Sequence, residues 1–265
     1  MISPYDSPVE IAEGVFWIGF YDVSRNLHCN PYLVIDGNEA VLIDGGSRTD
    51  FSSVMMKLLQ TGIKPSAISH LIYQHYDPDL CSSIPNFEDI IDKDDLNLLS
   101  QRENNVFIRY YSVRSRMFCV ESIGRELTMK AGRKLRFILT PYAHSAGSFM
   151  TFDERTGTLF SSDLFGSYDI KWELFVELTS GCADCEEEEP CPGGKDYCPV
   201  KGIKNFHRRI MTSRKALKYA MEQILPLKVE RIAPQHGSII RKKEDIGLLV
   251  ERLMTLDNVG IDGVC

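Results

Sequence analysis

The chain has 265 residues, a formal net charge of −7, 43% hydrophobic residues and 25% charged residues. This is the composition of a soluble globular protein, and no basic run stands out that could neutralise nucleic-acid phosphates. The N-terminus lacks a signal-peptide pattern and no apolar run reaches the length of a membrane span, so we expect a cytoplasmic protein with no membrane or nucleic-acid partner.

The first half of the chain predicts a mixed α/β domain. Short runs of β-branched and aromatic residues predict strands at 14–20, 31–37 and 39–46, with a hairpin at Asp36-Gly37-Asn38. An apolar face of helical period follows at 50–62, and a further strand at 67–74.

The second half continues this alternation. Its patterns predict, in order, a helix at 92–104, strands at 106–113 and 134–144, a hairpin at 149–163, a helix at 206–227, a strand at 229–237 and a closing helix at 243–256. We expect a single domain over residues 1–265, interrupted by an inserted loop at 179–202 that is poor in aliphatic residues and rich in cysteine.

Histidine and aspartate recur where the predicted strands end. The stretch QHYDPDLCSS has His75, Asp77 and Asp79 at alternate positions, which point the same way in an extended segment. The donors recognised in this way are His75, Asp77, Asp79, His144, Asp163 and His236. Each of them alone is more often a cap or turn residue, but six together indicate a centre for one or two iron, manganese or zinc ions.

Three segments carry a family resemblance: HYDPDLCSS, TPYAHSAGSFMTFDERTGTLFSSDLFGS and APQHG. They resemble the metal-binding segments of the metallo-β-lactamase superfamily, most closely those of the diiron domain of flavodiiron proteins and of oxygen-binding diiron proteins. The resemblance implies an α/β fold, an αββα four-layer sandwich with two irons at one edge of its sheets. The family pattern is H-x-E-x-D-H, followed by His, Asp and His.

The resemblance implies a role for each donor. It implies that the first metal is bound by His75, Asp77 and His144 and the second by Asp79 and His236, with Asp163 bridging the two metals. A carboxylate at position 77, where zinc hydrolases have His, favours iron over zinc.

Leu80 departs from the pattern, because an aliphatic side chain stands where the family supplies a second-metal imidazole. The second metal is therefore bound more weakly, is more open to an exogenous ligand, or is bound by another residue in place of the missing imidazole. The sequence offers four candidates for that replacement without ranking them: His28, Cys81, Tyr142 and Tyr168.

The remaining histidines and cysteines have simpler interpretations. His28 lies in a loop that approaches the metals in the family, whereas His70 is expected to be structural or on the surface, and His207 solvated. Ordinary thiols are expected at Cys29, Cys119 and Cys265.

The insertion contains the spacing C-x2-C-x5-C-x6-C, formed by Cys182, Cys185, Cys191 and Cys198. Four thiolates suffice for a zinc ion or for an iron–sulfur cluster of the [4Fe–4S] type, and two Cys-Pro pairs favour the cluster. A disulfide-linked loop or four unliganded thiols are the alternatives. A cluster could relay electrons in place of FMN, which we do not expect in this chain. The run 186–189 of four glutamates is expected to be a solvated face, or to dock a basic redox partner.

The sequence leads to a first hypothesis of a non-haem diiron protein that binds O₂, NO or peroxide and reduces it, with Tyr142 and Tyr168 donating hydrogen bonds to the ligand. The first alternative is an O₂ or redox sensor or carrier. The second is a zinc-dependent hydrolase of the same fold. A redox partner protein and a head-to-tail homodimer follow from the resemblance.

Overall fold

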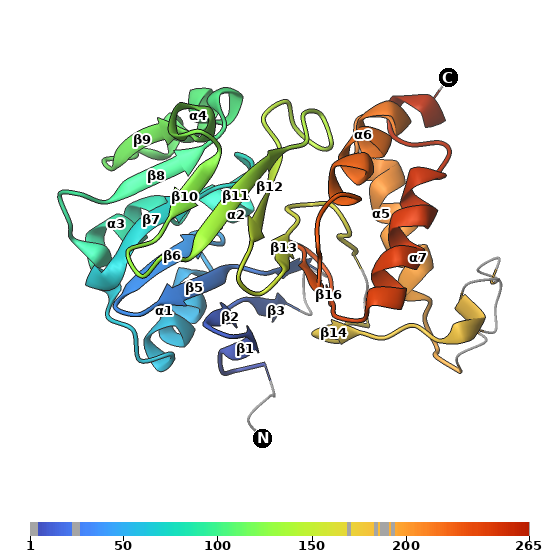
Figure 1. Cartoon of the computed structure of the whole chain (residues 1–265), viewed down its shortest axis with the longest axis horizontal. Helices are drawn as coiled ribbons and strands as arrows, with labels where there is room; N and C mark the ends of the chain where they lie inside the picture. The colour runs from blue at the N-terminus through green and yellow to red at the C-terminus, as the bar shows by residue number, and fades with distance from the viewer. Residues whose placement is uncertain are drawn as a thin grey trace.

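The computed structural model describes residues 5–22, 27–168, 171–182, 185, 191 and 194–264. In these residues two seven-stranded β-sheets lie face to face, and helices cover the outer side of each sheet (Figure 1). The order of layers is helices, sheet, sheet, helices. This confirms the predicted α/β fold with αββα layers.

The first sheet has the order β1-β2-β5-β6-β7-β8-β9. Its strands are β1 (Val9–Ala12), β2 (Val15–Trp17), β5 (Tyr32–Asp36), β6 (Glu39–Ile43), β7 (Ile68–Ile72), β8 (Asn97–Ser100) and β9 (Arg116–Cys119). The predicted hairpin between β5 and β6 is present, and Gly37 takes the positive φ of 63° that such a two-residue turn favours. A separate two-stranded hairpin joins β2 to β5 and consists of β3 (Phe20–Asp22) and β4 (Leu27–Cys29).

The second sheet has the order β10-β11-β12-β13-β15-β16-β14. Its strands are β10 (Glu126–Thr128), β11 (Lys134–Leu139), β12 (Phe149–Asp153), β13 (Thr158–Phe160), β14 (Phe175–Val176), β15 (Arg231–Ala233) and β16 (Ile239–Ile240). β11 and β13 are both antiparallel to β12, and β13 is parallel to β15. The chain therefore leaves β11, β13 and β15 at the same edge of the sheet.

The helices are α1 (Phe51–Gln60), α2 (Pro78–Cys81), α3 (Ile84–Ile91), α4 (Arg102–Ile108), α5 (Pro199–Ile210), α6 (Arg214–Ile224) and α7 (Lys243–Met254). Short 3₁₀ turns lie at Pro65–Ala67, Arg109–Tyr111, Val120–Ile123, Ser180–Cys182 and Ile261–Gly263. Within the described parts of the chain, no helix is both long and apolar enough to cross a membrane.

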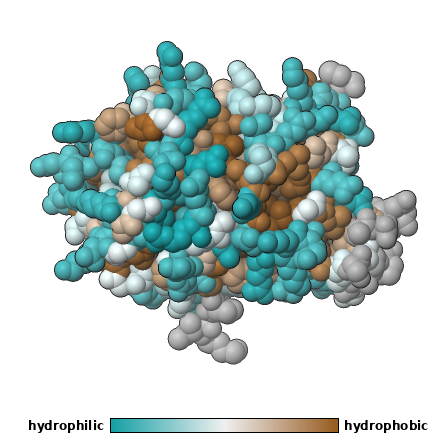
Figure 2. Space-filling view, viewed as in Figure 1, coloured by the Kyte–Doolittle hydropathy of each residue, from teal (hydrophilic) through white to brown (hydrophobic). Residues whose placement is uncertain are grey.

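Three apolar clusters hold these layers together. One lies between the two sheets and includes Trp17 and Phe160. A second packs α1 and α3 on the first sheet, and a third packs α5, α6 and α7 on the second sheet. Figure 2 shows apolar residues gathered on the face over α6 and α7. A surface groove there is lined by Ile224, Leu227, Val229, Ile246, Val250 and Met254.

Two predicted elements in the middle of the chain are wrong. The segment predicted as a helix at 92–104 contains β8, and the strand predicted at 106–113 is occupied mostly by α4 and a 3₁₀ turn. β8 is hydrogen-bonded on both sides, to β7 and β9, and Leu98 and Leu99 are buried. Burial on both faces removes the alternation that identifies a strand, so the spacing of the leucines resembles one side of a helix.

The single helix predicted at 206–227 is also wrong, because α5 and α6 are separate helices. Ser213 ends the break between them by accepting a hydrogen bond from the backbone N–H of Ala216. α5 also begins earlier than predicted, at Pro199, so the end of the cysteine-rich segment is helical rather than loop.

His207 on α5 is not solvated as predicted but fully buried. Its Nδ1 donates to the carbonyl of Ile203 at 2.7 Å, and its Nε2 accepts the backbone N–H of Phe165 at 3.0 Å. The second bond requires the neutral ring, because a protonated Nε2 cannot accept. Burial accordingly lowers the pKa of His207 from 6.5 to about 4.

We expect His207 to make the protein less stable in mild acid. The unfolded chain takes up this proton near pH 6.5 and the folded protein only near pH 4. The free energy of unfolding should therefore fall as the pH is lowered through this window, by about 3 kcal/mol at most. Urea unfolding between pH 7.5 and 4.5 measures the slope. His207→Gln should be less stable at pH 7.5 but have a shallower slope, and equal slopes would contradict the assignment.

Candidate metal centre

The six predicted donors come together at the edge where β7, β11, β13 and β15 end. His75 follows β7, and His144 lies in the connection from β11 to β12. Asp163 follows β13 and His236 follows β15, so the parallel ends of these strands bring both to one place.

The extended geometry expected for His75, Asp77 and Asp79 is only partly correct. Asp77 has an extended backbone, but it caps α2, and Asp79 is in the first turn of that helix. Their carboxylates consequently face different partners.

One group of donors consists of His75, Asp77 and His144, whose ligand atoms all lie within 4.8 Å of one another. The Nε2 atom of His144 is 3.0 Å from Oδ2 of Asp77, and the Nε2 atom of His75 is 3.8 Å from the same oxygen. His75 is buried, whereas His144 and Asp77 are partly accessible.

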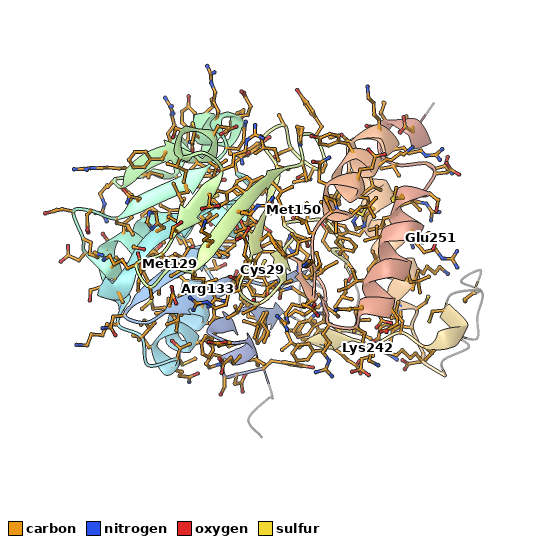
Figure 3. The ribbon with its side chains drawn as sticks, in the orientation of Figure 1. Cys29, Met129, Arg133, Met150, Lys242 and Glu251 are labelled. Carbon is orange, nitrogen blue, oxygen red and sulfur yellow. The ribbon has the colours of Figure 1, made fainter. Side chains whose placement is uncertain are left out.

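The other group consists of Cys29, Asp79 and His236, again within 4.8 Å. Oδ2 of Asp79 lies 3.2 Å from Nε2 of His236 and 3.8 Å from Sγ of Cys29. Cys29 was predicted to be an ordinary thiol, and its position in this group is the main site feature that the sequence interpretation missed. It is 1% exposed and is labelled in the interior of the molecule in Figure 3.

Asp163 lies between the two groups. Its Oδ1 is 3.7 Å from Nε2 of His75 and 3.8 Å from Nε2 of His236, and its Oδ2 is 3.7 Å from Nε2 of His144. The residue is 4% exposed, and no described residue donates a hydrogen bond to Oδ1. A buried carboxylate oxygen without a donor normally indicates an ion or water that completes it.

The three imidazoles are oriented by hydrogen bonds at their other nitrogen. Nδ1 of His75 lies 3.0 Å from the hydroxyl of Ser162, and Nδ1 of His144 lies 3.4 Å from the carbonyl of Ile210. Nδ1 of His236 lies 2.6 Å from the carbonyl of His28. This arrangement leaves each Nε2 facing the carboxylates, as outer-sphere partners do for metal-ligating histidines.

The carboxylates attract positive charge into the site. Burial disfavours the charged form of His144, but its bond to Asp77 and the charges of Asp163 and Asp77 raise its pKa to about 9. Burial likewise opposes the charged form of His236, yet its contact with Asp79 raises the pKa well above its ordinary value. Protons on these imidazoles balance the carboxylates as a cation would.

The donor set fits two metal ions. Ligands about 2.0 to 2.3 Å from a tetrahedral ion are roughly 3.3 to 3.8 Å from one another. The carboxylate oxygens of Asp77 and Asp79 lie 3.0 to 3.8 Å from the other donor atoms of their groups. His75, Asp77 and His144 would hold one ion, and Asp79 and His236 the other, with Asp163 shared between them. Mixed imidazole and carboxylate donors suit iron, manganese and zinc.

The four candidates for replacing the ligand absent at Leu80 lie in different places. Leu80 is fully buried in the cluster under α1 and α3, together with Cys81, whose Sγ donates to the carbonyl of His75 at 3.5 Å. The ring of His28 stacks on Tyr21 and Trp172, at 4.6 and 4.8 Å between centroids, and its carbonyl contacts the ring of His236.

The two predicted oxygen-contacting tyrosines differ in position. The ring of Tyr168 lies 6.1 Å from that of His236 and 4.6 Å from that of Phe206, so it is beside the second donor group. Tyr142 is 60% exposed, and its carbonyl accepts a hydrogen bond from Thr212. His70 is partly buried beside the hydroxyl of Ser69, in keeping with a structural role.

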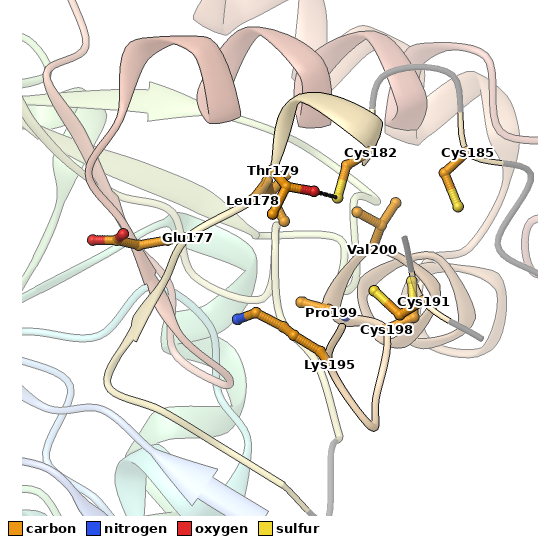
Figure 4. A pocket seen from close by; sticks show the side chains of 10 residues that line it. All are labelled: Glu177, Leu178, Thr179, Cys182, Cys185, Cys191, Lys195, Cys198, Pro199 and Val200. Carbon is orange, nitrogen blue, oxygen red and sulfur yellow. Dashed lines mark hydrogen bonds between the residues drawn. The ribbon is translucent and has the colours of Figure 1, made fainter. Parts of the chain in front are cut away.

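The four cysteines of the insertion line one pocket (Figure 4). Cys198 caps α5, and its Sγ accepts the backbone N–H of Lys201 at 3.4 Å. Sγ of Cys182 lies 3.5 Å from the hydroxyl of Thr179. The seven described cysteines form no disulfide with one another, so the disulfide-linked loop is not supported there. Residues 183–184, 186–190 and 192–193, which include the glutamate run, and Cys265 lie outside the described residues.

The facing sheets, the helical outer layers and the donors at their edge define a β-lactamase-like fold. The model of the family described as "ODP family beta lactamase" matches residues 27–237, and the chain belongs to this family. Its fold superposes on a structure described as "Peroxy diiron species of chemotaxis sensor ODP" with a TM-score of 0.77 and 24% identity, covering 97% of this chain and 98% of the sensor.

Flavodiiron proteins share the fold over part of their length. The structure of the flavodiiron protein from Giardia intestinalis matches with a TM-score of 0.75 and 18% identity, over 95% of this chain and 59% of that one. Coenzyme F420H(2) oxidase of Methanocaldococcus jannaschii is 23% identical over 248 residues, 87% of this chain and 56% of the oxidase. The chain thus spans little more than half the length of these relatives.

Proposed function

We propose that the chain is a non-haem diiron protein that binds O₂ or NO and reduces it. The observation that carries this proposal is the buried Asp163 carboxylate between two donor groups, with Oδ1 facing an imidazole of each group. Two irons held there would supply the electrons for reduction of a bound diatomic molecule. Relatives named as a diiron sensor and as flavodiiron proteins support iron as the metal.

The surrounding residues would orient the ligands and manage protons. The carbonyls of His28 and Ile210 and the hydroxyl of Ser162 keep the three imidazoles in position. Burial raises the pKa of Tyr168, so its hydroxyl remains protonated beside the second group and can donate a hydrogen bond. Tyr142 has the same proposed role from a more exposed position.

A second candidate function is that of an O₂ or redox sensor or carrier. The family match and the structural likeness to a chemotaxis sensor favour it. Oxygen and NO consumption with a chemical reductant separates the two functions. A reductase consumes many equivalents per chain, whereas a sensor takes up one equivalent and retains it.

We further propose that Cys182, Cys185, Cys191 and Cys198 hold a [4Fe–4S] cluster or a zinc ion. Their common pocket and the helix N-terminus at Cys198 both favour bound thiolates. α5 begins at this pocket and its other end contacts His144, about 18 Å away at 1.5 Å per residue. A cluster here could serve as an electron relay, whereas zinc would stabilise the segment.

Metal and acid-labile sulfide contents, with Mössbauer spectra of protein purified without oxygen, test both centres. We expect about two irons at the Asp163 centre, and about four more with sulfide if the cysteines hold a cluster. Cys182→Ser with Cys198→Ser should remove only the second set. Zinc at both places and no iron would reject oxygen chemistry and leave the zinc-dependent hydrolase. A redox partner protein, a homodimer and a cytoplasmic location rest on the sequence interpretation and are part of this proposal.

A further inference from the structure

We propose that Cys29 is a thiolate ligand of the second metal, completing a donor set with Asp79, His236 and Asp163. This inference rests on the proposed two-metal centre. Without Cys29 the second position has three protein donors. Leu80 cannot supply a fourth because its side chain has no donor atom, and it packs in the apolar cluster under α1 and α3. With Cys29 it has one nitrogen, two oxygens and one sulfur.

The geometry of the second group supports coordination by sulfur. Sγ of Cys29 is 3.8 Å from Oδ2 of Asp79, which is itself 3.2 Å from Nε2 of His236. The same Nε2 is 3.8 Å from Oδ1 of Asp163. These three separations compare with the roughly 3.3 to 3.8 Å between neighbouring ligands of a tetrahedral ion whose bond to sulfur is about 2.3 Å. Oδ1 of Asp163, to which no described residue donates a hydrogen bond, thus lies beside the imidazole of this group.

The backbone holds Cys29 against the turn that carries His236. The N–H of Asn30 donates to the carbonyl of Gln235 at 2.9 Å, and Nδ1 of His236 donates to the carbonyl of His28 at 2.6 Å. On its other side Cys29 pairs with Phe20 in the β3–β4 hairpin. One neighbour of Cys29, Asn30, is thus hydrogen-bonded to Gln235, and the other, His28, to the ring of His236. These bonds hold the two donors in a fixed arrangement.

A structural thiol is the ordinary explanation for a buried cysteine, and the surroundings of Cys29 argue against it. Cys29 is 1% exposed but belongs to none of the three apolar clusters. Cys81 is equally buried and does belong to one, under α1 and α3. Both thiols lie close to the proposed donors, so Cys81 can serve as the control for substitutions of Cys29.

A thiolate would make the two metal positions unequal. The first has two imidazoles and carboxylates, whereas the second has one imidazole, carboxylates and sulfur. A thiolate donates more charge than the neutral imidazole it replaces, so it favours the higher oxidation state of iron and also suits zinc. The ligand set therefore biases the two metals toward different reactivity.

Cobalt(II) reconstitution tests the assignment without depending on activity. In protein carrying Cys182→Ser and Cys198→Ser, which removes the competing thiolate site, we expect two cobalt ions per chain and a sulfur-to-cobalt charge-transfer band. X-ray absorption should show a scatterer at about 2.3 Å. Adding Cys29→Ser should abolish both signals. It should also lower the affinity for one of the two cobalt ions by more than the roughly 10–100-fold that is typical of losing an outer-shell partner. Adding Cys81→Ser should leave both signals unchanged.

The outcomes separate this inference from the proposed function. Two bound cobalt ions with no sulfur signal would overturn the role of Cys29 and leave the two-metal centre intact. Failure to bind two ions would reject the centre itself, and with it the ligand. If Cys29→Ser does not fold, two bound cobalt ions without the band in the parent protein would still overturn the assignment, and a band that persists after Cys185→Ser and Cys191→Ser are added would support it.

Discussion

Asp163→Ala is expected to remove both irons from the centre at once. The carboxylate faces His75 and His236 through Oδ1 and His144 through Oδ2, so both donor groups lose a ligand and a negative charge. The affinity of each of the two positions for iron should fall by more than the roughly 10–100-fold that is typical of losing an outer-shell partner. Iron content after anaerobic reconstitution and desalting, with Mössbauer spectra, measures the result.

Two further variants provide the controls for Asp163→Ala. Asp77→Asn should weaken only the ion near His144, and Asp79→Asn only the ion near His236, because each carboxylate contacts a different imidazole. Each should leave about one iron at this centre. If Asp163→Ala also retains one firmly bound iron, Asp163 does not bridge the two positions. Circular dichroism of each variant confirms that the fold is retained.

The sequence predicted the six donors from their joint occurrence and from their spacing, which resembles a family pattern, although each residue type alone is common in caps and turns. Cys29 escaped the same reasoning because its role depends on a contact across more than two hundred residues, between the β3–β4 hairpin and the turn that carries His236. Only the three-dimensional structure reveals such a contact. The sequence did indicate the loop, since His28 was considered, but strand alternation points the ring of His28 away and the thiol of Cys29 inward.

The errors in secondary structure have different physical origins. β8 lies between parallel strands, with Leu98 and Leu99 buried, whereas the helix predicted at 206–227 is divided by the break before Ser213. Local patterns predict β5, β6, α1 and α7 well because each has one buried and one accessible side or a clear turn. Where tertiary packing covers both faces, the periodicity on which the prediction depends disappears.

Arg133, labelled in Figure 3, forms a buried ion pair in the second sheet and hydrogen bonds to the first. Its guanidinium donates to both carboxylate oxygens of Asp153 on β12, at 3.0 and 2.5 Å. It also donates to the carbonyls of Glu13 and Ile35 on the side of the first sheet, both at 3.1 Å. Arg133 is 1% and Asp153 0% exposed, so neither charge has water as an alternative partner.

Arg133→Met is expected to lower the free energy of unfolding by about 3 to 5 kcal/mol, because it leaves the Asp153 charge buried without its partner. Urea unfolding at pH 7.5 measures the change. Arg136→Met is the matched control: Arg136 pairs with Glu154 at 3.3 Å with both side chains largely exposed, and its loss should cost within about 0.5 kcal/mol. Adding Asp153→Asn to Arg133→Met should recover part of the lost stability, since the uncompensated charge is gone. Equal effects of the two arginine substitutions would show that the buried pair contributes no more stability than the exposed one.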